Sequence, residues 1–432
     1  MRMKIKILPL FLPLVFISIF IIFGSFILNN VSAQKESSGG HVPGQVLVKF
    51  KNGTSQSVID AETRKQNGKV ARKIDRLNVL ALKVPQGAEG KVVAALSQNP
   101  HVEYAEPDYI AYALWTPNDP FFGDQWGLLN TTTLNADIHT TAAWDTTKGN
   151  GTVVAILDTG ISSGHPDLSS QVINRVNFSD AATDDDVYGH GTHVGGIVAA
   201  LTDNTAGVAG GCPQCKLLSV KVLNDSGSGA YSWIADGIIY ATDYGAKVIN
   251  MSLGGPFKSV TLENAVKYAW NHNVVVVAAA GNSGNTSKTY PGAYTNAIAV
   301  AATDNQDHKA SFSEYGSWVD VAAPGVSIYS TWNDSSSGSN PQPVCYSGTE
   351  CYKSASGTSM ATPMTSAVVA LIWSTNKYTT ASAVRNRIES TADKISGTGT
   401  YWMSGRVNAA NAVGDYTPSS TPTPTPKSRK NK

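Results

Sequence analysis

The chain has few charged residues and almost no net charge. Of its 432 residues, 15% are Asp, Glu, Lys or Arg, and the formal net charge is +1 at pH 7. Because so small a positive charge does not attract a polyanion, we expect no nucleic-acid partner. The low charged fraction argues against a disordered or coiled-coil protein, and 42% hydrophobic residues suffice for a large buried core.

The amino end has the pattern of an export signal. Three basic residues precede an almost wholly apolar stretch over residues 7–28, and small residues at 31–33 fit a cleavage site. We therefore predict a signal peptide over residues 1–33 and a secreted protein. The apolar stretch is also long enough to span a bilayer, which takes about 20 residues, so a membrane anchor formed by an uncleaved signal is the second interpretation.

Cysteine is scarce as well. The chain has Cys212, Cys215, Cys345 and Cys351. In an exported protein these are expected to form two disulfides, for which three pairings exist. We favour the local pairs, Cys212 with Cys215 and Cys345 with Cys351. A Cys-Pro-Gln-Cys redox site is the alternative, but the thioredoxin-like context is missing and the secreted compartment disfavours it.

Glycine, in contrast, is plentiful at 39 residues, and three glycine-marked segments each hold a reactive side chain. Asp158 follows a short β-branched and aliphatic run at 153–157 that predicts a buried strand. His190 lies in a Gly-His-Gly-Thr-His pattern, and Ser359 stands between Gly357-Thr358 and an apolar helical run. The three side chains follow one another in the order of the subtilisin triad.

With a fourth segment, Ala278-Ala279-Ala280-Gly281-Asn282, these motifs make the chain resemble the subtilisin-type serine endopeptidases, and within them the thermitase-like branch. Each segment alone has an ordinary interpretation as a turn, a metal-binding histidine pair or a helix cap. Their occurrence together in one order makes chance improbable. The resemblance implies a secreted, monomeric serine endopeptidase that hydrolyses proteins and peptides through an acyl-enzyme.

The chemistry of peptide hydrolysis explains these residue types. The Ser359 hydroxyl is a weak nucleophile at neutral pH, so a base must take its proton, and histidine at position 190 suits that role. Asp158 would fix the imidazole tautomer and stabilise the imidazolium. By resemblance, the Asn282 amide and the Ser359 backbone N–H form the oxyanion hole. His193 could join His190 in a zinc site, but further ligands are missing.

Before residue 112, strands and helices are predicted to alternate. The strands cover residues 45–50, 79–84 and 102–108, and the helices cover 58–66 and 89–98. We interpret them as a β-α-β-β-α-β arrangement, the ferredoxin-like motif. In the subtilisin family such a segment is an inhibitory propeptide, here residues 34–112, removed by self-cleavage within 109–114. A permanent small domain unrelated to inhibition is the alternative.

Residues 113–416 are predicted to form one α/β peptidase domain. Apolar runs lie at 217–223, 248–252, 274–279, 298–302 and 319–322, and helical stretches lie at 232–244, 260–271 and 358–374. This alternation predicts a mostly parallel, doubly wound sheet, with the site beyond the carboxyl ends of its strands. The tail, residues 417–432, is rich in Pro and Thr and then basic, and is predicted to be extended and solvated.

The resemblance also implies where a peptide substrate binds. Glycine-rich segments that contain Ser228-Gly229 and Leu253-Gly254 would pair with an extended peptide. From the sequence alone, plain bulges or turns are an equally good interpretation of these segments. The pocket for the residue before the cleaved bond, the P1 residue, would be formed by Ser252, Leu253, Gly254, Ala279, Ala280, Gly281 and Thr289. Small wall residues imply a roomy apolar pocket and a broad specificity that favours large apolar P1 residues.

Calcium is the structural cofactor that the resemblance implies. The matching segments would supply side-chain oxygens of Asp119, Asp167 and Asn204 and backbone carbonyls of Leu201, Ala206 and Val208. Hard oxygen ligands of this kind suit Ca²⁺. A second acidic cluster, Asp180 with residues 184–186, precedes His190; a weaker calcium site and a solvated acidic loop fit it equally well.

Overall fold

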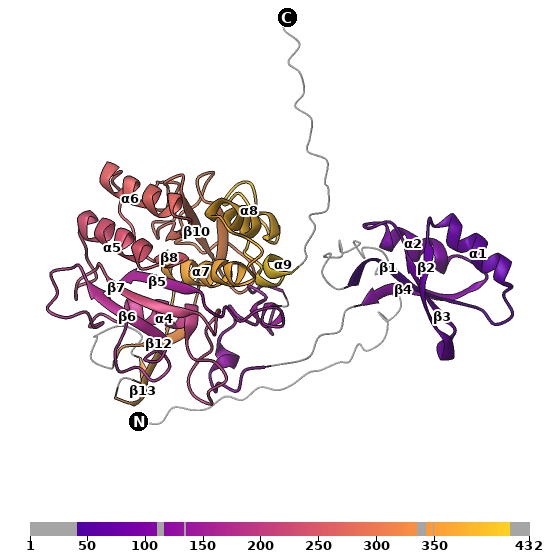
Figure 1. The fold of residues 1–432 in the computed structure, drawn as a ribbon, viewed down its shortest axis with the longest axis horizontal. Coiled ribbons are helices and arrows are strands. Elements are labelled where there is room, and N and C mark those ends of the chain that lie inside the picture. Colours follow the sequence, from indigo (N-terminus) through magenta and orange to yellow (C-terminus); the bar gives the residue numbers. More distant parts are fainter. Residues whose placement is uncertain (1–40, 110–115, 134, 335–342, 349, 415–432) are drawn as a thin grey trace, which may run out of the picture. The chain divides into compact units, whose positions relative to one another are not determined.

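The computed structural model of this chain describes residues 41–109, 116–133, 135–334, 343–348 and 350–414 (Figure 1). The chain divides into two compact units, Met1–Ile110 and Ala111–Lys432. The predicted signal peptide, nearly all of the predicted self-cleavage zone and the predicted tail lie outside the described residues. Within the described ranges, no helix combines the length and the apolar character needed to cross a membrane.

The first unit is a four-stranded sheet with two helices. Its elements are β1 (His41–Phe50), α1 (Gln56–Lys65), β2 (Lys69–Ile74), β3 (Val79–Lys83), α2 (Glu89–Ser97) and β4 (Val102–Tyr109). The strands lie in the order β2-β3-β1-β4, and every neighbouring pair is antiparallel. The ferredoxin-like arrangement expected from the sequence is confirmed.

One face of this sheet forms the core of the first unit. Val46, Val48 and Phe50 of β1 are buried while the residues between them are partly exposed, and they pack with Val92 and Leu96 of α2. Strand β2 had no sequence prediction. It lies at the edge of the sheet and none of its residues is buried, so the alternation of apolar residues that reveals a half-buried strand is absent from it.

The second unit is larger. Its strands are β5 (Val153–Asp158), β6 (Val172–Asn177), β7 (Lys216–Lys221), β8 (Val248–Met251), β9 (Val275–Ala279), β10 (Ala297–Thr303), β11 (Val321–Pro324), β12 (Ile328–Trp332), β13 (Val344–Ser347) and β14 (Glu350–Ala355). Its helices are α3 (Thr140–Ala143), α4 (His190–Ala199), α5 (Tyr231–Asp243), α6 (Val260–Asn271), α7 (Thr358–Ser374), α8 (Ala381–Thr391) and α9 (Ala409–Val413).

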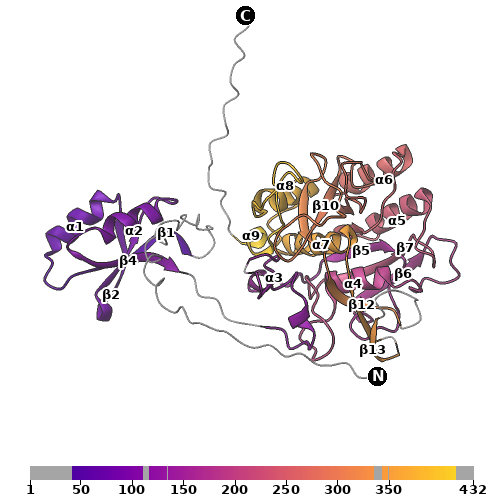
Figure 2. The same cartoon turned by 180° about the vertical axis from the view of Figure 1, so that it is seen from behind.

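A seven-stranded sheet crosses the second unit in the order β11-β10-β9-β8-β5-β7-β6, with every neighbouring pair parallel. Helices α5 and α6 cover one face, and α4 and α7 cover the other (Figures 1 and 2). In β5, Val154 and Ile156 pack against α4 and α7, whereas Ala155 and Leu157 pack against α5 and α6. Burial on both faces explains the continuous apolar runs, and the predicted doubly wound fold is confirmed.

The strand predicted at residues 217–223 ends two residues early, at Lys221. The N–H groups of Val222 and Leu223 both donate to one acceptor, the carbonyl of Asp158, at 2.9 and 3.0 Å. Because two successive donors share this carbonyl, the regular ladder of β7 stops there. Apolar character therefore continues beyond the strand and into the loop.

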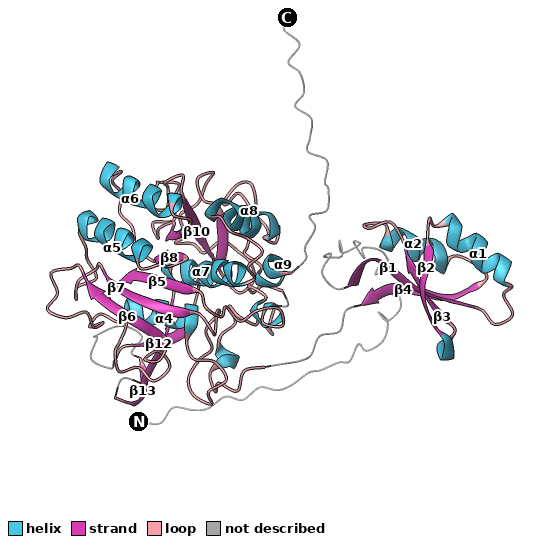
Figure 3. Ribbon diagram, viewed as in Figure 1, coloured by secondary structure: helices cyan, strands magenta, loops and turns pink. Residues whose placement is uncertain are grey.

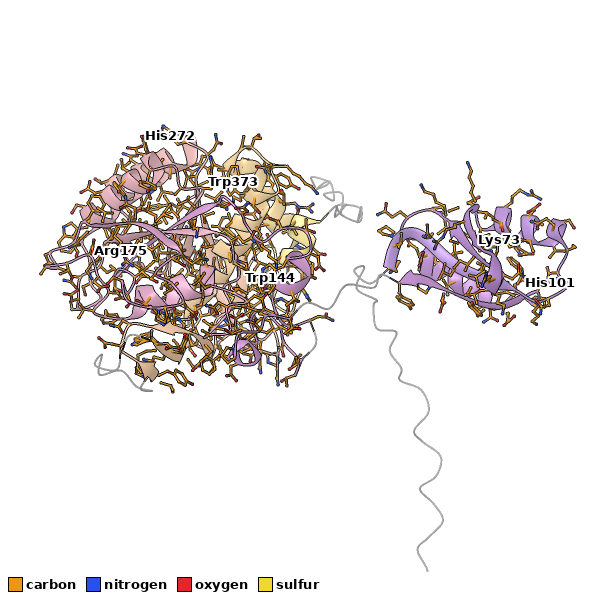
Figure 4. The ribbon with its side chains drawn as sticks, turned by 60° about the horizontal axis from the view of Figure 1, so that its bottom comes forward. Lys73, His101, Trp144, Arg175, His272 and Trp373 are labelled. Carbon is orange, nitrogen blue, oxygen red and sulfur yellow. A yellow bond between two sulfur atoms is a disulfide. The ribbon has the colours of Figure 1, made fainter. Side chains whose placement is uncertain are left out.

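A separate antiparallel sheet, in the order β12-β14-β13, lies beside the main one (Figure 3). A disulfide between Cys345 and Cys351 joins β13 to β14. The second disulfide links Cys212 to Cys215 before β7. These are the two pairings favoured from the sequence. Trp144, labelled in Figure 4, donates from its indole Nε1 to the carbonyl preceding Cys212, at 3.1 Å.

Candidate active site

The predicted catalytic side chains meet at one edge of the seven-stranded sheet, the carboxyl edge, where its parallel strands end. Asp158 is the last residue of β5, Ser252 directly follows β8, and Asn282 lies three residues beyond β9. His190 is the first residue of α4, and Ser359 is the second residue of α7. Both helices thus begin at this edge, with free N–H groups and the positive ends of their dipoles.

Asp158 and His190 are hydrogen-bonded. The distance from His190 Nδ1 to Asp158 Oδ1 is 2.7 Å, and the N–H of Thr159 donates to the same oxygen at 2.8 Å. Since a carboxylate only accepts hydrogen bonds, Nδ1 carries the proton and Nε2 is left free to accept one. The Asp158 side chain is completely buried, so the pair is shielded from water on the Asp158 side.

The surroundings of His190 favour its protonated form. Burial acts to lower the pKa of His190, but the charge of Asp158, the hydrogen bond to it and the charge of Asp186 together outweigh burial, so the pKa is raised above its ordinary value. Gly189 precedes His190 with φ at 97°, in the region that favours glycine. A Cβ at this position would also overlap the Trp332 ring.

Asp186 holds the start of α4 in place. Its buried carboxylate accepts hydrogen bonds from the N–H groups of Gly189 and Thr192, each at 2.8 Å. It also accepts from the Thr159 hydroxyl at 2.8 Å, and that hydroxyl accepts the N–H of Gly191 at 2.9 Å. Strand β5 and helix α4 are therefore tied together beside the Asp158 and His190 pair.

The acidic cluster before His190 does not converge on one point. Asp185 accepts from the N–H and hydroxyl of Ser163, at 2.8 and 2.9 Å, and Asp180 accepts from Asn224 at 3.0 Å. The described part of the chain holds no group of three or more His, Cys, Asp or Glu side chains suited to a metal ion. Both interpretations of this cluster, a weaker calcium site and a solvated acidic loop, stay predictions.

Ser359 is turned toward Ser252. The Ser359 hydroxyl donates to the Ser252 carbonyl at 3.0 Å, and the Ser252 hydroxyl donates to the Ser359 carbonyl at 2.8 Å. Hydrogen bonds between described residues do not include one from Ser359 to His190. Catalytic hydrogen bonds often form fully only when substrate is bound, so this orientation is compatible with a nucleophile at rest.

The amide of Asn282 has a fixed orientation. Its Oδ1 accepts from both the N–H and the hydroxyl of Thr358, each at 2.9 Å. Because a backbone N–H only donates, the oxygen of the amide must face Thr358 and the NH₂ group must face away from it. The Thr358 hydroxyl also accepts the N–H of Gly281 at 3.1 Å. The donor group of Asn282 is thus preoriented.

The ring of His193 is buried and bonded to backbone carbonyls. Its Nε2 lies 3.1 Å from the carbonyl of Ile328 and 3.0 Å from that of Lys353, so Nε2 carries a proton that it donates to them. Burial lowers the pKa of His193 to about 3. A neutral, fully buried ring that donates in this way does not act as the base.

A cleft of about 500 Å³ lies along the carboxyl edge, and five of the predicted substrate-binding residues line it: Ser228, Gly229, Ser252, Leu253 and Gly254. Beside it, Thr289 contacts both predicted walls of the P1 pocket. A Cβ on Gly254 would overlap Thr289 Cγ2, and a Cβ on Gly281 would lie 2.7 Å from Thr289 Oγ1. Ala279 and Ala280, also predicted for this pocket, are buried and do not line the cleft.

Glu314 is a site residue that sequence reasoning missed. The Thr289 hydroxyl donates to Glu314 Oε2 at 2.6 Å, and a Cβ on Gly281 would overlap that oxygen. The N–H of Glu314 donates to the Gly281 carbonyl at 3.0 Å. No motif marks this glutamate, because a loop far along the chain brings it to the site.

The six predicted calcium ligands are linked to one another. Asn204 donates from its side chain to Asp167 at 2.9 Å and from its N–H to Asp119 at 3.3 Å. The carbonyls of Leu201, Ala206 and Val208 accept no hydrogen bond from the described residues. Burial raises the pKa of Asp167 to about 6, and the charge of Asp119 adds to that effect. Buried carboxylates beside unused carbonyls fit a Ca²⁺ ion.

The arrangement at the carboxyl edge is suited to attack on a carbonyl carbon by a serine, with a histidine that a carboxylate orients. A model of the subtilase family matches residues 149–416, more than half of the chain, and the chain belongs to that family. A second model, the fervidolysin N-terminal prodomain, matches residues 28–108. The chain is a subtilisin-like serine endopeptidase with an N-terminal prodomain.

Comparisons with individual proteins support the same family assignment. The thermophilic serine proteinase of Bacillus sp. (strain AK1) is 46% identical, over 89% of this chain and 90% of its own length. Thermitase of Thermoactinomyces vulgaris is 50% identical, over 69% of this chain and 99% of its own. Among solved structures, a protease from Pseudoalteromonas arctica matches with a TM-score of 0.61 and 34% identity, covering 69% of this chain and 99% of that one. The predicted thermitase-like resemblance is confirmed.

Proposed function

We propose that the protein is a secreted, monomeric endopeptidase that works through an Asp158, His190 and Ser359 triad and matures by self-cleavage. The observation that carries the proposal is the 2.7 Å hydrogen bond between Asp158 and His190 at the edge where Ser359 begins α7. It leaves His190 Nε2 as an acceptor for the proton of the serine hydroxyl.

In the first step, Ser359 Oγ attacks the carbonyl carbon of the cleaved peptide bond while His190 Nε2 takes the hydroxyl proton. Asp158 stabilises the imidazolium. His190 then gives the proton to the leaving amine, and an acyl-enzyme remains on Ser359. Water attacks the ester in the same way, with His190 again as base, and releases the acid and the free serine.

The carbonyl oxygen becomes negatively charged during each attack. Two donors support that charge in the proposal: the Asn282 NH₂ group, which its bonds to Thr358 turn away from that residue, and the backbone N–H of Ser359. As the second residue of α7, Ser359 has no acceptor for its N–H within the helix. Fixed donors cost no reorganisation as the charge develops.

An extended peptide would lie in the cleft against the glycine-rich segments around Gly229 and Gly254, with main-chain hydrogen bonds for affinity and pockets for preference. The proposed specificity is broad and favours large apolar P1 residues. The first unit would act as an intramolecular inhibitor, in line with the fervidolysin prodomain match. Residues 1–33 would be removed as a signal peptide, residues 34–112 as the propeptide, and residues 113–416 would form the mature domain.

Calcium is proposed as the structural cofactor. The side chains of Asp119, Asp167 and Asn204 and the three unused carbonyls would hold it, because they offer oxygen ligands around two buried carboxylates. A bound Ca²⁺ supplies the positive charge that offsets the repulsion between those carboxylates. The residues themselves join the amino end of the second unit to the segment after α4.

The proposal is tested by N-terminal sequencing and casein hydrolysis of the purified full chain beside Ser359→Ala, both with calcium. The wild type is expected to lose the segment before about residue 113 and to cleave casein, while the variant stays full-length and inert. Processing and hydrolysis by the variant at wild-type rates would remove Ser359 from the mechanism.

A further inference from the structure

A carboxylate lies at the base of the proposed P1 site, which is the space between Ser252–Gly254 and Ala279–Gly281 with Thr289 at its base. The two walls follow β8 and β9, which pair in parallel, so they leave the sheet side by side. Thr289 touches both walls, its Cγ2 toward Gly254 and its Oγ1 toward Gly281. Whatever Thr289 binds therefore lies beside both walls of the proposed site.

Thr289 binds Glu314. The hydroxyl of Thr289 donates to Glu314 Oε2 at 2.6 Å, and this oxygen occupies the position that a side chain on Gly281 would take. Gly281 has φ at 111°, and the N–H of Glu314 donates to its carbonyl at 3.0 Å. Backbone and side-chain contacts together fix the carboxylate against the wall of the P1 site.

Glu314 has no cation of its own. The residue is 3% exposed, and no ion pair within the described residues includes it. Lys309, five residues earlier, donates instead to the carbonyls of Ala310 and Ser313 and lies 4.8 Å from the centre of the Tyr315 ring. A buried carboxylate without a partner charge is costly.

One oxygen of Glu314 remains available. Only Oε2 has a hydrogen-bond donor among the described residues, and Oε1 is not one of the completely buried atoms that lack a partner. Oε1 therefore keeps a small surface that water can reach. A carboxylate held this way at the base of a pocket can select a cationic side chain by charge.

We propose that Glu314 directs the enzyme toward substrates with lysine or arginine at P1. This inference rests on the proposed function and departs from it in one respect: it replaces the preference for large apolar P1 residues by a preference for cationic ones. The small apolar walls pack against the methylene stem of a long side chain, as they would against a large apolar one. The ammonium or guanidinium group at the end of the stem then pairs with Glu314 Oε1, which removes the unpaired buried charge.

The experiment measures kcat/KM of the enzyme matured from the full chain on peptides that differ only at P1. Lysine is compared with norleucine, which lacks only the ammonium group, and arginine with its neutral counterpart citrulline. We expect each cationic peptide to exceed its neutral partner by about 30-fold, the order of effect of a buried charge pair. Equal rates within each pair, or faster neutral peptides, would overturn the proposal.

Glu314→Gln is the matched variant, and Glu263→Gln on α6 is its control. Glutamine keeps the shape and removes the charge, so the lysine-to-norleucine ratio is expected to fall to about one, while the control keeps the wild-type ratio. An unchanged ratio in Glu314→Gln means that Glu314 only holds Thr289. If this variant fails to fold, the wild-type kcat/KM ratios of lysine to norleucine and of arginine to citrulline test the proposal on their own.

A failure of the proposed function can be distinguished from a failure of the specificity inference. A P1 phenylalanine peptide and the Ser359→Ala variant report on the triad whatever the role of Glu314. Serine-dependent cleavage of the phenylalanine peptide without a preference for cations contradicts the specificity inference alone. Cleavage of every peptide by Ser359→Ala would contradict the triad itself.

Discussion

The two edges of the seven-stranded sheet are built from the same strands but carry different side chains. At the carboxyl edge, Asp158, Ser252 and Asn282 lie at or just beyond the ends of three neighbouring strands and bond to residues of α4 and α7. At the opposite, amino edge, Thr152 and Lys247 precede two of these strands and line a hollow of about 360 Å³ with Trp373. Trp373 is labelled in Figure 4.

Helix direction explains this difference. Helices α4 and α7 begin at the carboxyl edge, with His190 and Ser359, and they end away from it, at Ala199 and Ser374. Helix N-termini offer free N–H groups and a positive potential, whereas C-termini offer carbonyls. A reaction whose transition state develops negative charge is therefore stabilised at the carboxyl edge. Substitutions there are expected to reduce activity, and changes at the far ends of the two helices to reduce stability.

Asp158→Asn gives the largest expected effect. The amide would donate to His190 Nδ1 and hold the wrong tautomer, so kcat should fall by about 10⁴-fold, as in the trypsin-type triad from which this magnitude comes. The melting temperature should change little. Steady-state kinetics and calorimetry beside the exposed Asp236→Asn test this. A loss below tenfold would take Asp158 out of the triad.

Removal of calcium tests the far end of α4. Free Ca²⁺ at 1,000 times its Kd would stabilise the fold by about 4 kcal/mol. Each kcal/mol shifts the melting temperature by about 2–4 °C, so EDTA should lower the melting temperature by roughly 10 °C.

The pKa of Asp167 is about 4 in the unfolded chain, the ordinary value for aspartate, and about 6 in the fold. Since its pKa is raised in the fold, metal-free stability should fall as pH rises through that window.

The matching calorimetry with Ca²⁺ restored should show no such fall, because the ion compensates the ionised carboxylate. Calcium affinity should drop as pH falls below about 6, where Asp167 takes up a proton. A melting temperature that EDTA leaves unchanged at pH 8 would rule out the proposed site.

Asn282→Ala is expected to lower kcat by about 10² to 10³-fold, the loss found for the corresponding donor in subtilisin itself. KM should stay close to wild type, because the donor acts on charge that develops in the transition state. Asn285→Ala, in the same loop and exposed, serves as control. Equal losses in both variants would point to a disturbed loop.

The pH dependence of kcat/KM should follow His190. The pKa of His190 is raised, and the base must be neutral, so activity should fall tenfold per pH unit below a midpoint that lies above 6.5, the ordinary value for histidine. Initial rates from pH 5 to pH 9 with a single peptide measure that midpoint. A midpoint below 6.5 would mean that burial outweighs Asp158.

Lys247→Met at the amino edge should have the smallest effect. The Lys247 ammonium lies 5.6 Å from the centre of the Trp373 ring, an interaction worth about 0.5–1 kcal/mol at an exposed site. We expect a melting temperature lower by about 2 °C and an unchanged kcat/KM. A clear loss of activity would contradict the expectation that only substitutions at the carboxyl edge reduce activity.

Glycine-marked segments predicted Asp158, His190, Ser359 and Asn282 as catalytic candidates because each motif combines a turn with its candidate reactive residue in one short stretch. The doubly wound fold could be predicted as well, since strands buried on both faces are apolar throughout. Strand β2 could not, because its exposed residues show no alternation.

The amino-acid sequence by itself determined the fold class and the family and supplied the candidate reacting side chains, because these depend on local patterns. Only the tertiary structure decided which groups surround them. Glu314 reaches Thr289 from 25 residues away, and Asp186 acts on α4 through hydrogen bonds rather than through a motif. Such contacts depend on how loops pack in three dimensions, and spacing along the chain does not encode that packing.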